Sequence, residues 1–304
     1  MEWYNMGRYT VDREPWDAAL IEWVAMRNII EWRRFVPVRI LVALAFCGAT
    51  RMLLAQASGV RSPTAVAPDW AQPGSATHTQ VAPPPDFHRP SRNFVTPIGV
   101  FDGQSDIGSA LAPGSASYDA ATEQYTIQSA GYNIWYTRDE FRYLWKRMSG
   151  DVSLAADINY PDPLGYGDRK AVLMIRQSLD DDAKAAMVAL HGAGMVHLAW
   201  RPERDMRVTD MEFRVGGRGW PGGASPDSLV TIVAKRIGIE KRGDEFSLWV
   251  SLDGEPMHQF GPPIKLHFDE PFYVGIGFCS HLPTTVDTAV LSNVVLENAA
   301  GRVK

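Results

Sequence analysis

The sequence is poor in cysteine and has no concentrated positive charge. Its two cysteines are Cys47 and Cys279, and its formal net charge is −5 without any block of Lys and Arg. A chain that lacks such a block has no surface to follow a phosphate backbone, so we expect no nucleic-acid partner. We expect Cys47 to be removed with a leader, which leaves one thiol and no internal disulfide. The mature domain must then rely on its core, which about 200 residues can supply.

Long apolar runs are also scarce. The longest, residues 40–50, is shorter than the roughly 20 residues that a membrane span needs. Arginines precede it, and Ala55-Gln56-Ala57 follows with small residues, which is the order of a signal peptide. We therefore predict that residues 1–57 are an N-terminal extension and signal peptide. The mature chain would be exported, periplasmic or extracellular, and would carry no transmembrane anchor.

The exact start and type of this leader stay open. Met26 followed by Arg27 fits the start of a signal peptide better than Met1 does, so either methionine could begin translation. Cys47 permits a lipoprotein interpretation, although the bulky Phe46 before it fits poorly. Arg33-Arg34 is weakly typical of twin-arginine export.

Beyond the leader, composition separates a linker from a folded domain. Residues 58–93 are rich in Pro, Ala, Ser and Thr and show no sustained period, which predicts an extended linker. Residues 94–304 alternate short apolar runs with turn residues at intervals of about 8 to 12, which is typical of an all-β sandwich. The strands that we expect are 124–128, 133–136, 141–148, 152–159, 170–177, 184–191, 195–201, 229–236, 245–252, 272–279 and 288–297.

Several runs in this domain carry a family resemblance: Asn133-Ile-Trp-Tyr-Thr-Arg-Asp139, Trp145-Lys-Arg-Met-Ser-Gly-Asp151, Arg169-Lys-Ala-Val-Leu-Met-Ile-Arg176, His191-Gly-Ala-Gly194 and Tyr273-Val-Gly-Ile-Gly-Phe-Cys-Ser-His281. Together they resemble a bacterial secreted subgroup of the concanavalin A-like lectin/glucanase superfamily. This subgroup is the domain of unknown function related to "regulation of enolase" proteins, which also occurs with TolB-like proteins. The resemblance implies a jelly roll of two curved antiparallel sheets and the handling of carbohydrate. It implies no catalytic residues.

The hairpin within residues 170–191 offers a candidate binding surface. If Lys170 lies opposite His191, strand alternation places both on one face together with Arg176. A tight turn at Ala193-Gly194 would add Trp200 to the same face. Cations, an imidazole and an indole suit a sugar, because the sugar ring stacks on the aromatic group while the donors bind hydroxyls or a carboxylate. An equally open interpretation pairs Lys170 and Arg176 with acids and places Trp200 in the core.

Two further segments are expected near this surface. If the strand 272–279 continues, His281 shares a face with Gly275 and Gly277, and glycines in a strand mark the close approach of a ligand or of another backbone. Trp135 could supply a second stacking surface or could be part of the core. The predicted ligand-binding residues are therefore Lys170, Arg176, His191, Trp200, His281 and Trp135.

An enzymatic role would need chemistry that only part of the sequence offers. Retaining glucanases place two carboxylates on one strand, and the Glu-x-Asp-x-x-Glu arrangement that does so is absent. A polysaccharide lyase needs a base and a cation beside a uronate, and His191 or His281 with Lys170 and Arg176 could supply them. His191 and His281 are accordingly the catalytic candidates for a lyase or glycoside hydrolase.

Metal signals are weak. No His or Cys cluster has zinc spacing along the chain, and we expect no cofactor except possible calcium at Asp102 and Asp106. Three functions stay open: an exported domain that binds polysaccharide or oligosaccharide without cleaving it, which we favour, an enzyme acting on polysaccharide, and a non-catalytic accessory module of an envelope complex. The third would bind a protein partner in place of a glycan.

Overall fold

The computed structural model describes residues 89–214, 234–251 and 254–304. The predicted leader (1–57) and most of the predicted linker lie outside these ranges. The described strands are β1 Arg92–Phe94, β2 Gly103–Ile107, β3 Ser115–Asp119, β4 Gln124–Ser129, β5 Phe141–Met148, β6 Val152–Asn159, β7 Lys170–Arg176, β8 Ala185–His191, β9 Met195–Arg201, β10 Thr209–Arg214, β11 Arg236–Arg242, β12 Glu245–Ser251, β13 His258–Gln259, β14 Ile264–Lys265, β15 Phe272–Cys279 and β16 Asp287–Glu297. Within those residues, no helix is long and apolar enough to cross a bilayer.

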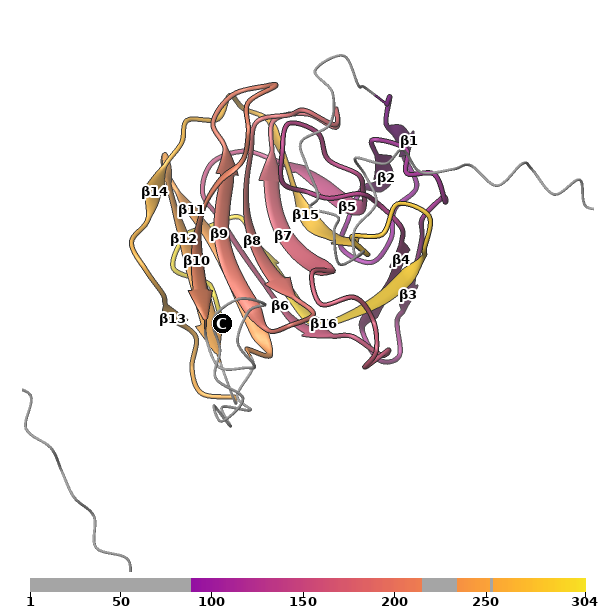
Figure 1. Ribbon diagram of the computed structural model, residues 1–304. Helices are drawn as coiled ribbons and strands as arrows, with labels where there is room; N and C mark the ends of the chain where they lie inside the picture. Colours follow the sequence, from indigo (N-terminus) through magenta and orange to yellow (C-terminus); the bar gives the residue numbers. More distant parts are fainter. Residues whose placement is uncertain (1–88, 215–233, 252–253) are drawn as a thin grey trace, which may run out of the picture. The chain divides into compact units, whose positions relative to one another are not determined.

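The strands form two sheets that pack face to face (Figure 1). The first sheet has the order β1-β2-β5-β15-β7-β8-β9-β10, and the second has the order β13-β12-β11-β6-β16-β4-β3, with β14 paired to β12. Every pairing between these strands is antiparallel. The predicted all-β antiparallel sandwich is therefore confirmed.

The main core lies between the two sheets and follows from strand alternation. Every second side chain of a strand points to the same face, so each apolar set has a period of two. From the first sheet the core receives Leu144, Ala171, Leu173, Ile175, Val188, Leu198, Val274, Ile276 and Phe278, and from the second Leu154, Ile239, Leu248 and Leu291. Full burial of one large apolar side chain contributes about 1.5 to 3 kcal/mol, so this layer holds the two sheets together.

The first sheet is also covered on the side turned away from the second sheet, which we call the outer face. Tyr143 of β5, Val172 of β7 and Met187 of β8 form a smaller apolar cluster there with Ile134 and Val208 from the loops. Strands β7 and β8 are consequently buried on both faces along their whole length. Polar side chains on this face are therefore held between the sheet and the loops that cover it.

Two strand predictions need correction. Residues 133–136 form no strand; the chain makes only an isolated bridge between Ile134 and Asp139, within the loop that covers the outer face. The strand expected over 229–236 falls largely on residues outside the described ranges, and β11 begins at Arg236, where that prediction ended. Predicted bounds are confirmed for β5, β6, β9 and β15.

The two glycines of β15 serve strand packing. A Cβ atom on Gly275 would lie 1.8 Å from the carbonyl oxygen of Leu144 on the neighbouring strand β5. At Gly277 a Cβ atom would meet the Phe141 ring at 2.7 Å. The two glycines thus allow β5 and its side chains to approach closely. Of the two expectations for these glycines, a nearby ligand or a nearby backbone, the structure shows the backbone.

Candidate functional site

The site begins with the register of the β7–β8 hairpin. Lys170 lies opposite His191, the pairing on which the predicted surface was conditional, and both side chains are on the outer face. In the next hairpin Ala186 pairs with Trp200, so Trp200 packs against the main core and its predicted place on the ligand face is wrong. His197 and Arg201 take the outer-face positions.

The physical reason is the length of one turn. A two-residue turn at Ala193-Gly194 would pair Ala189 with Leu198, but the strands are joined by three residues, 192–194, and Ala189 pairs with His197. Gly194 has φ +87°, the left-handed conformation that three-residue hairpin turns place at a glycine. One additional residue in the turn moves every β9 side chain to the opposite face.

Lys170 is the centre of a polar group at one end of the outer face. Its Nζ donates a hydrogen bond to Asn133 Oδ1 at 2.6 Å and lies 3.3 Å from His281 Nδ1. The ammonium also lies 5.6 Å from the centre of the Trp135 ring. Only 2% of Lys170 is exposed, and within the described ranges it makes no ion pair. A buried cation thus has neutral neighbours as its direct contacts.

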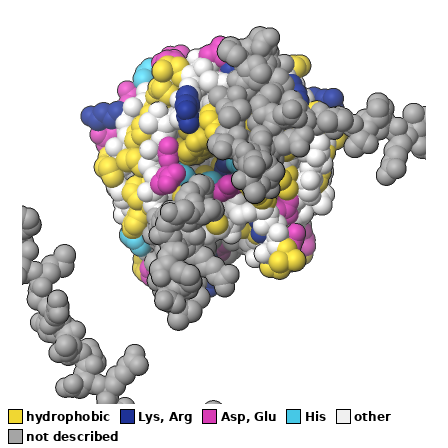
Figure 2. Space-filling view, viewed as in Figure 1, with side chains coloured by type: hydrophobic (Ala, Val, Ile, Leu, Met, Phe, Trp, Pro, Cys, Tyr) yellow, Lys and Arg dark blue, Asp and Glu magenta, His cyan; other side chains and the backbone are white. Residues whose placement is uncertain are grey.

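Three histidines lie near this cation: His281 contacts it, His191 lies opposite Lys170 on β8, and His197 packs against His191. We call Lys170, His191, His197 and His281 the lysine–histidine cluster. The rings of His191 and His197 have centroids 4.6 Å apart, and His281 stacks on Tyr166 at 5.4 Å. Among the residues that the structure describes, neither ring nitrogen of His191 has a hydrogen-bond partner. Figure 2, drawn from the side on which β7, β8 and β9 face the viewer, shows histidine and acidic side chains together near the middle of this face.

Burial sets the charge state of the cluster. Desolvation lowers the pKa of Lys170. Desolvation, reinforced by the Lys170 charge, holds the pKa of His191 and of His281 well below the ordinary histidine value. Both imidazoles are therefore neutral at pH 7 and can accept a proton or a hydrogen bond. Burial raises the pKa of the Cys279 thiol to about 12, so this residue fills space and is no nucleophile.

The backbone at His281 is strained. Its φ is +65°, a left-handed conformation that non-glycine residues adopt rarely. The strand β15 ends at Cys279, so the alternation that predicted the position of His281 does not extend to it. The left-handed turn nevertheless brings the imidazole beside Lys170, as expected. Strain of this kind persists where surrounding contacts enforce it, and it is concentrated at functional positions.

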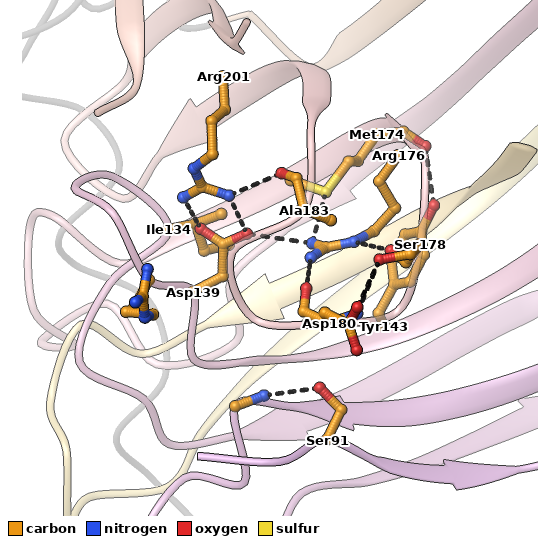
Figure 3. Close-up of polar contacts among 12 residues, drawn as sticks. Ser91, Ile134, Asp139, Tyr143, Met174, Arg176, Ser178, Asp180, Ala183 and Arg201 are labelled. Atoms are coloured by element: carbon orange, nitrogen blue, oxygen red, sulfur yellow. Dashed lines mark hydrogen bonds and ion pairs between the residues drawn. The ribbon is translucent and has the colours of Figure 1, made fainter. Parts of the chain in front are cut away.

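Arg176 belongs to a different environment, shown in Figure 3. It lies at the far end of β7, roughly 20 Å from Lys170 at the usual strand rise. Its guanidinium donates to Ser178 O at 2.8 Å, to Asp139 Oδ2 at 3.2 Å and to Asp180 O. The structure therefore places Arg176 on the predicted face but does not bring it together with Lys170.

Arg201 completes this second group. Its Nη2 and Nη1 donate to the two oxygens of Asp139 at 2.6 and 2.9 Å, and its remaining donors bind the carbonyl oxygens of Ala183, Tyr136 and Met206. We call Asp139, Arg176 and Arg201 the arginine pair with its aspartate. All three are buried, and their donors and acceptors are matched within the protein (Figure 3).

The two acids expected to bind calcium, Asp102 and Asp106, contact different residues. Asp106 is buried in β2 and accepts hydrogen bonds from Arg142 Nη1 at 2.8 Å and Gly114 N at 3.3 Å. Asp102 precedes that strand, accepts from Arg147 N at 3.1 Å and lies 3.7 Å from Lys146 Nζ. The two carboxylates thus have different protein partners, and calcium binding there stays a prediction.

Another group has the composition of a metal site. Ligand atoms of His197, Asp210 and Glu212 all lie within 4.8 Å of one another, on the paired strands β9 and β10. Spacing along the chain gave no indication of this group, because its members come from two strands. His197 itself could have been placed by the alternation of Val196, Leu198 and Trp200, whose apolar side chains mark the core face.

The remaining residues of the site were missed for a similar reason. Asn133, Tyr166 and Asp168 lie in loops, where no periodicity indicates which way a side chain points. Asp168 Oδ1 lies 3.8 Å from His191 Nδ1. Trp135, which was predicted, also lies in a loop and meets the His197 ring edge to face at 5.0 Å.

Comparisons with known proteins give fold similarity only. No family model and no curated protein matches the chain. A functionally unknown protein from Saccharomyces cerevisiae is 12% identical with a TM-score of 0.44, covering 62% of this chain and 95% of that one. The carbohydrate binding module CBM66 from Bacillus subtilis is 16% identical (TM-score 0.39; 61% and 92% covered), and the alginate lyase from Klebsiella pneumoniae is 11% identical (TM-score 0.40; 62% and 85% covered).

Proposed function

We propose that the domain binds an acidic carbohydrate, a polysaccharide or oligosaccharide that contains uronate, at the lysine–histidine cluster. The observation that carries this proposal is the environment of Lys170. Its ammonium is buried against an amide oxygen and an imidazole, and the described residues give it no ion pair. Burying an unpaired charge is costly, and a carboxylate from a bound sugar would offset that cost.

The neighbours of Lys170 fit the rest of a sugar. Trp135 and Tyr166 are half-buried aromatic side chains, one beside the ammonium and one stacked on His281. Pyranose rings pack against such surfaces, while their hydroxyls need hydrogen-bond partners. His191 offers ring nitrogens that make no hydrogen bond within the described ranges. A polysaccharide ligand also suits a chain carried to the periplasm or outside the cell by residues 1–57, and we propose that location.

The test uses the full chain and two ligand classes. We expect calorimetry to show binding of a soluble polyuronate and much weaker binding of a neutral glucan of the same length. Lys170→Met should weaken polyuronate binding by at least about tenfold, the equivalent of one charged hydrogen bond. Its thermal midpoint should stay the same or rise, because an unpaired buried charge has been removed.

The matched control is Lys146→Met. Lys146 lies on β5 of the same sheet, is 42% exposed and has Asp102 3.7 Å away. Its removal should leave polyuronate affinity unchanged. Equal binding of the neutral glucan, or unchanged affinity of Lys170→Met, would overturn the proposal. Capture of a protein partner without any glycan binding would instead favour an accessory module.

A lyase is the second candidate, and His191 is the observation in its favour. Burial keeps this imidazole neutral, and its ring nitrogens have no hydrogen-bond partner among the described residues, so it can act as a general base. Lys170, opposite it on β7, would neutralise the uronate carboxylate next to the proton removed. His281 is less suited, because its Nδ1 faces the ammonium. A lyase releases unsaturated ends that absorb ultraviolet light, and His191→Ala should abolish them; a binding domain leaves the polymer intact.

A further inference from the structure

The strands β9 and β10 bring three metal-ligating side chains to one place on the outer face. Glu212 lies directly opposite His197, and Asp210 lies opposite Ala199, two positions along the same face. One ligand atom from each residue lies within 4.8 Å of the other two. Because both strands belong to a hydrogen-bonded ladder, their backbones hold this spacing without help from a loop.

His197 has unsatisfied hydrogen-bonding capacity in this arrangement. Its Nδ1 lies 3.2 Å from Asp210 Oδ2, and its Nε2 is buried without a hydrogen-bond partner in the described ranges. If Nδ1 carries the proton, the Nε2 lone pair is left without a donor. If Nε2 carries the proton, the Nδ1 lone pair faces a carboxylate oxygen, which also accepts. A cation between Nδ1 and the carboxylates would replace this contact between two acceptors with coordination of both to the metal, with the proton on Nε2.

From this geometry we propose that His197, Asp210 and Glu212 bind one divalent transition-metal ion of the zinc class. Imidazole nitrogen with carboxylate oxygens is a donor set that zinc accepts, whereas calcium prefers oxygen ligands in larger number. Three protein ligands leave a coordination position open. Glu212 is exposed, so the site is reached from solvent. The proposal is independent of the glycan ligand, although the His197 ring lies 4.6 Å from that of His191 within the lysine–histidine cluster.

The experiment titrates the chelator-treated full chain with zinc chloride. We expect calorimetry and elemental analysis to give one zinc per chain, with at least tenfold weaker binding of calcium chloride. Glu212→Gln and Asp210→Asn should each weaken zinc binding at least tenfold. Because a ligand that binds only the folded state stabilises it, zinc should raise the thermal midpoint of the wild-type chain and should not raise that of Glu212→Gln.

The matched control is His267→Ala. His267 is an exposed histidine with Asp244 Oδ1 at 3.1 Å and Asp269 Oδ1 at 3.8 Å, so it tests whether any surface histidine between two acids would bind zinc. Its loss should leave stoichiometry and affinity unchanged. Absence of stoichiometric zinc in the wild-type chain would overturn the proposal. Unchanged affinity in both Glu212→Gln and Asp210→Asn would overturn it as well, and because Glu212 is exposed, misfolding would not explain a loss in Glu212→Gln.

Discussion

The two ends of the outer face bury similar side chains in opposite ways. Around Asp139, the guanidiniums of Arg176 and Arg201 bind the same carboxylate, and their other donors bind carbonyl oxygens of loops. The hydrogen bonds and charges at this end are therefore satisfied within the protein. Around Lys170, the ammonium has an amide oxygen and an imidazole as its contacts, and His191 makes no hydrogen bond in the described ranges. Burial is thus the same at both ends. The internal balance of charges and hydrogen bonds differs, and this difference is the basis on which we propose the Lys170 end for binding.

The largest expected effect is on stability and comes from a substitution at the Asp139 end of the outer face. Asp139→Asn removes the negative charge between two buried guanidiniums, and the loss of one partner from a buried ion pair costs about 3 to 5 kcal/mol. We expect the free energy of unfolding, measured by urea denaturation, to fall by this amount. Polyuronate affinity, measured where the variant is folded, should not change, because Asp139 belongs to the structural end.

Asp205→Asn is the control for that substitution. Asp205 is 63% exposed and pairs with Arg138, and such surface pairs contribute less than about 1 kcal/mol. If Asp139→Asn costs no more than Asp205→Asn, the arginine pair with its aspartate does not stabilise the fold, and the contrast between the two ends fails.

A smaller effect concerns acid sensitivity at the other end. His191 has a folded-state pKa well below 6.5, so the unfolded chain binds more protons than the folded chain once the pH falls under that value. Stability is therefore retained above about pH 6.5 and lost below it, by up to about 1.4 kcal/mol per pH unit for one such group. His191→Gln should reduce the loss of stability between about pH 7 and about pH 5, measured by urea denaturation at each pH.

The exposed His267 again supplies the comparison, because His267→Gln removes a histidine without touching the cluster. Its curve of stability against pH is measured beside that of His191→Gln as the reference for a histidine substitution outside the cluster. If His191→Gln and the wild-type chain lose the same stability on acidification, burial of the neutral imidazole is not a source of acid sensitivity. The contrast between the Lys170 end and the Asp139 end of the outer face would then be wrong.

The smallest expected effects distinguish the role of Trp135 in ligand binding from the role of Trp200 in the core. Trp135 lies beside Lys170, whereas Trp200 packs against the main core. Trp135→Phe should weaken polyuronate binding about threefold, since the smaller ring stacks less well but keeps an aromatic surface. Trp200→Phe should lower the thermal midpoint by a few degrees and leave affinity unchanged. The opposite pattern in calorimetry and thermal melting would show that ligand approaches from the other sheet face.

Much of the fold could be predicted because apolar alternation is strong in the central strands. The bounds of β5, β6, β9 and β15 follow from that period. The pairing of Lys170 with His191 was a condition of the argument, and the structure has that pairing. Edge strands carry less of this information. The strands β2 and β3 consist mainly of small and polar residues, Gly103–Ile107 and Ser115–Asp119, and therefore resemble loops in sequence.

The site was predictable only in part, for a geometric reason. Lys170 and His191 lie on a hairpin whose register the sequence constrains, but Asn133 and Tyr166 reach the cluster from loops, and loops have no period to read. Arg176 illustrates a further limit. Alternation correctly places it on the outer face, and the alternative interpretation that it pairs with an acid is confirmed, but periodicity could not identify Asp139 in a distant loop as that acid.

The three-residue turn between β8 and β9 also determines which changes in length this region can tolerate. Deleting or inserting a single residue among positions 192–194 would reverse the faces of β9. It would move His197 and Arg201 toward the main core and bring Val196 and Leu198 to the outer face. Two added residues would preserve the pattern. Homologous chains should therefore vary in this turn by even numbers of residues, and a single-residue difference should be accompanied by exchange of polar and apolar positions along the whole of β9.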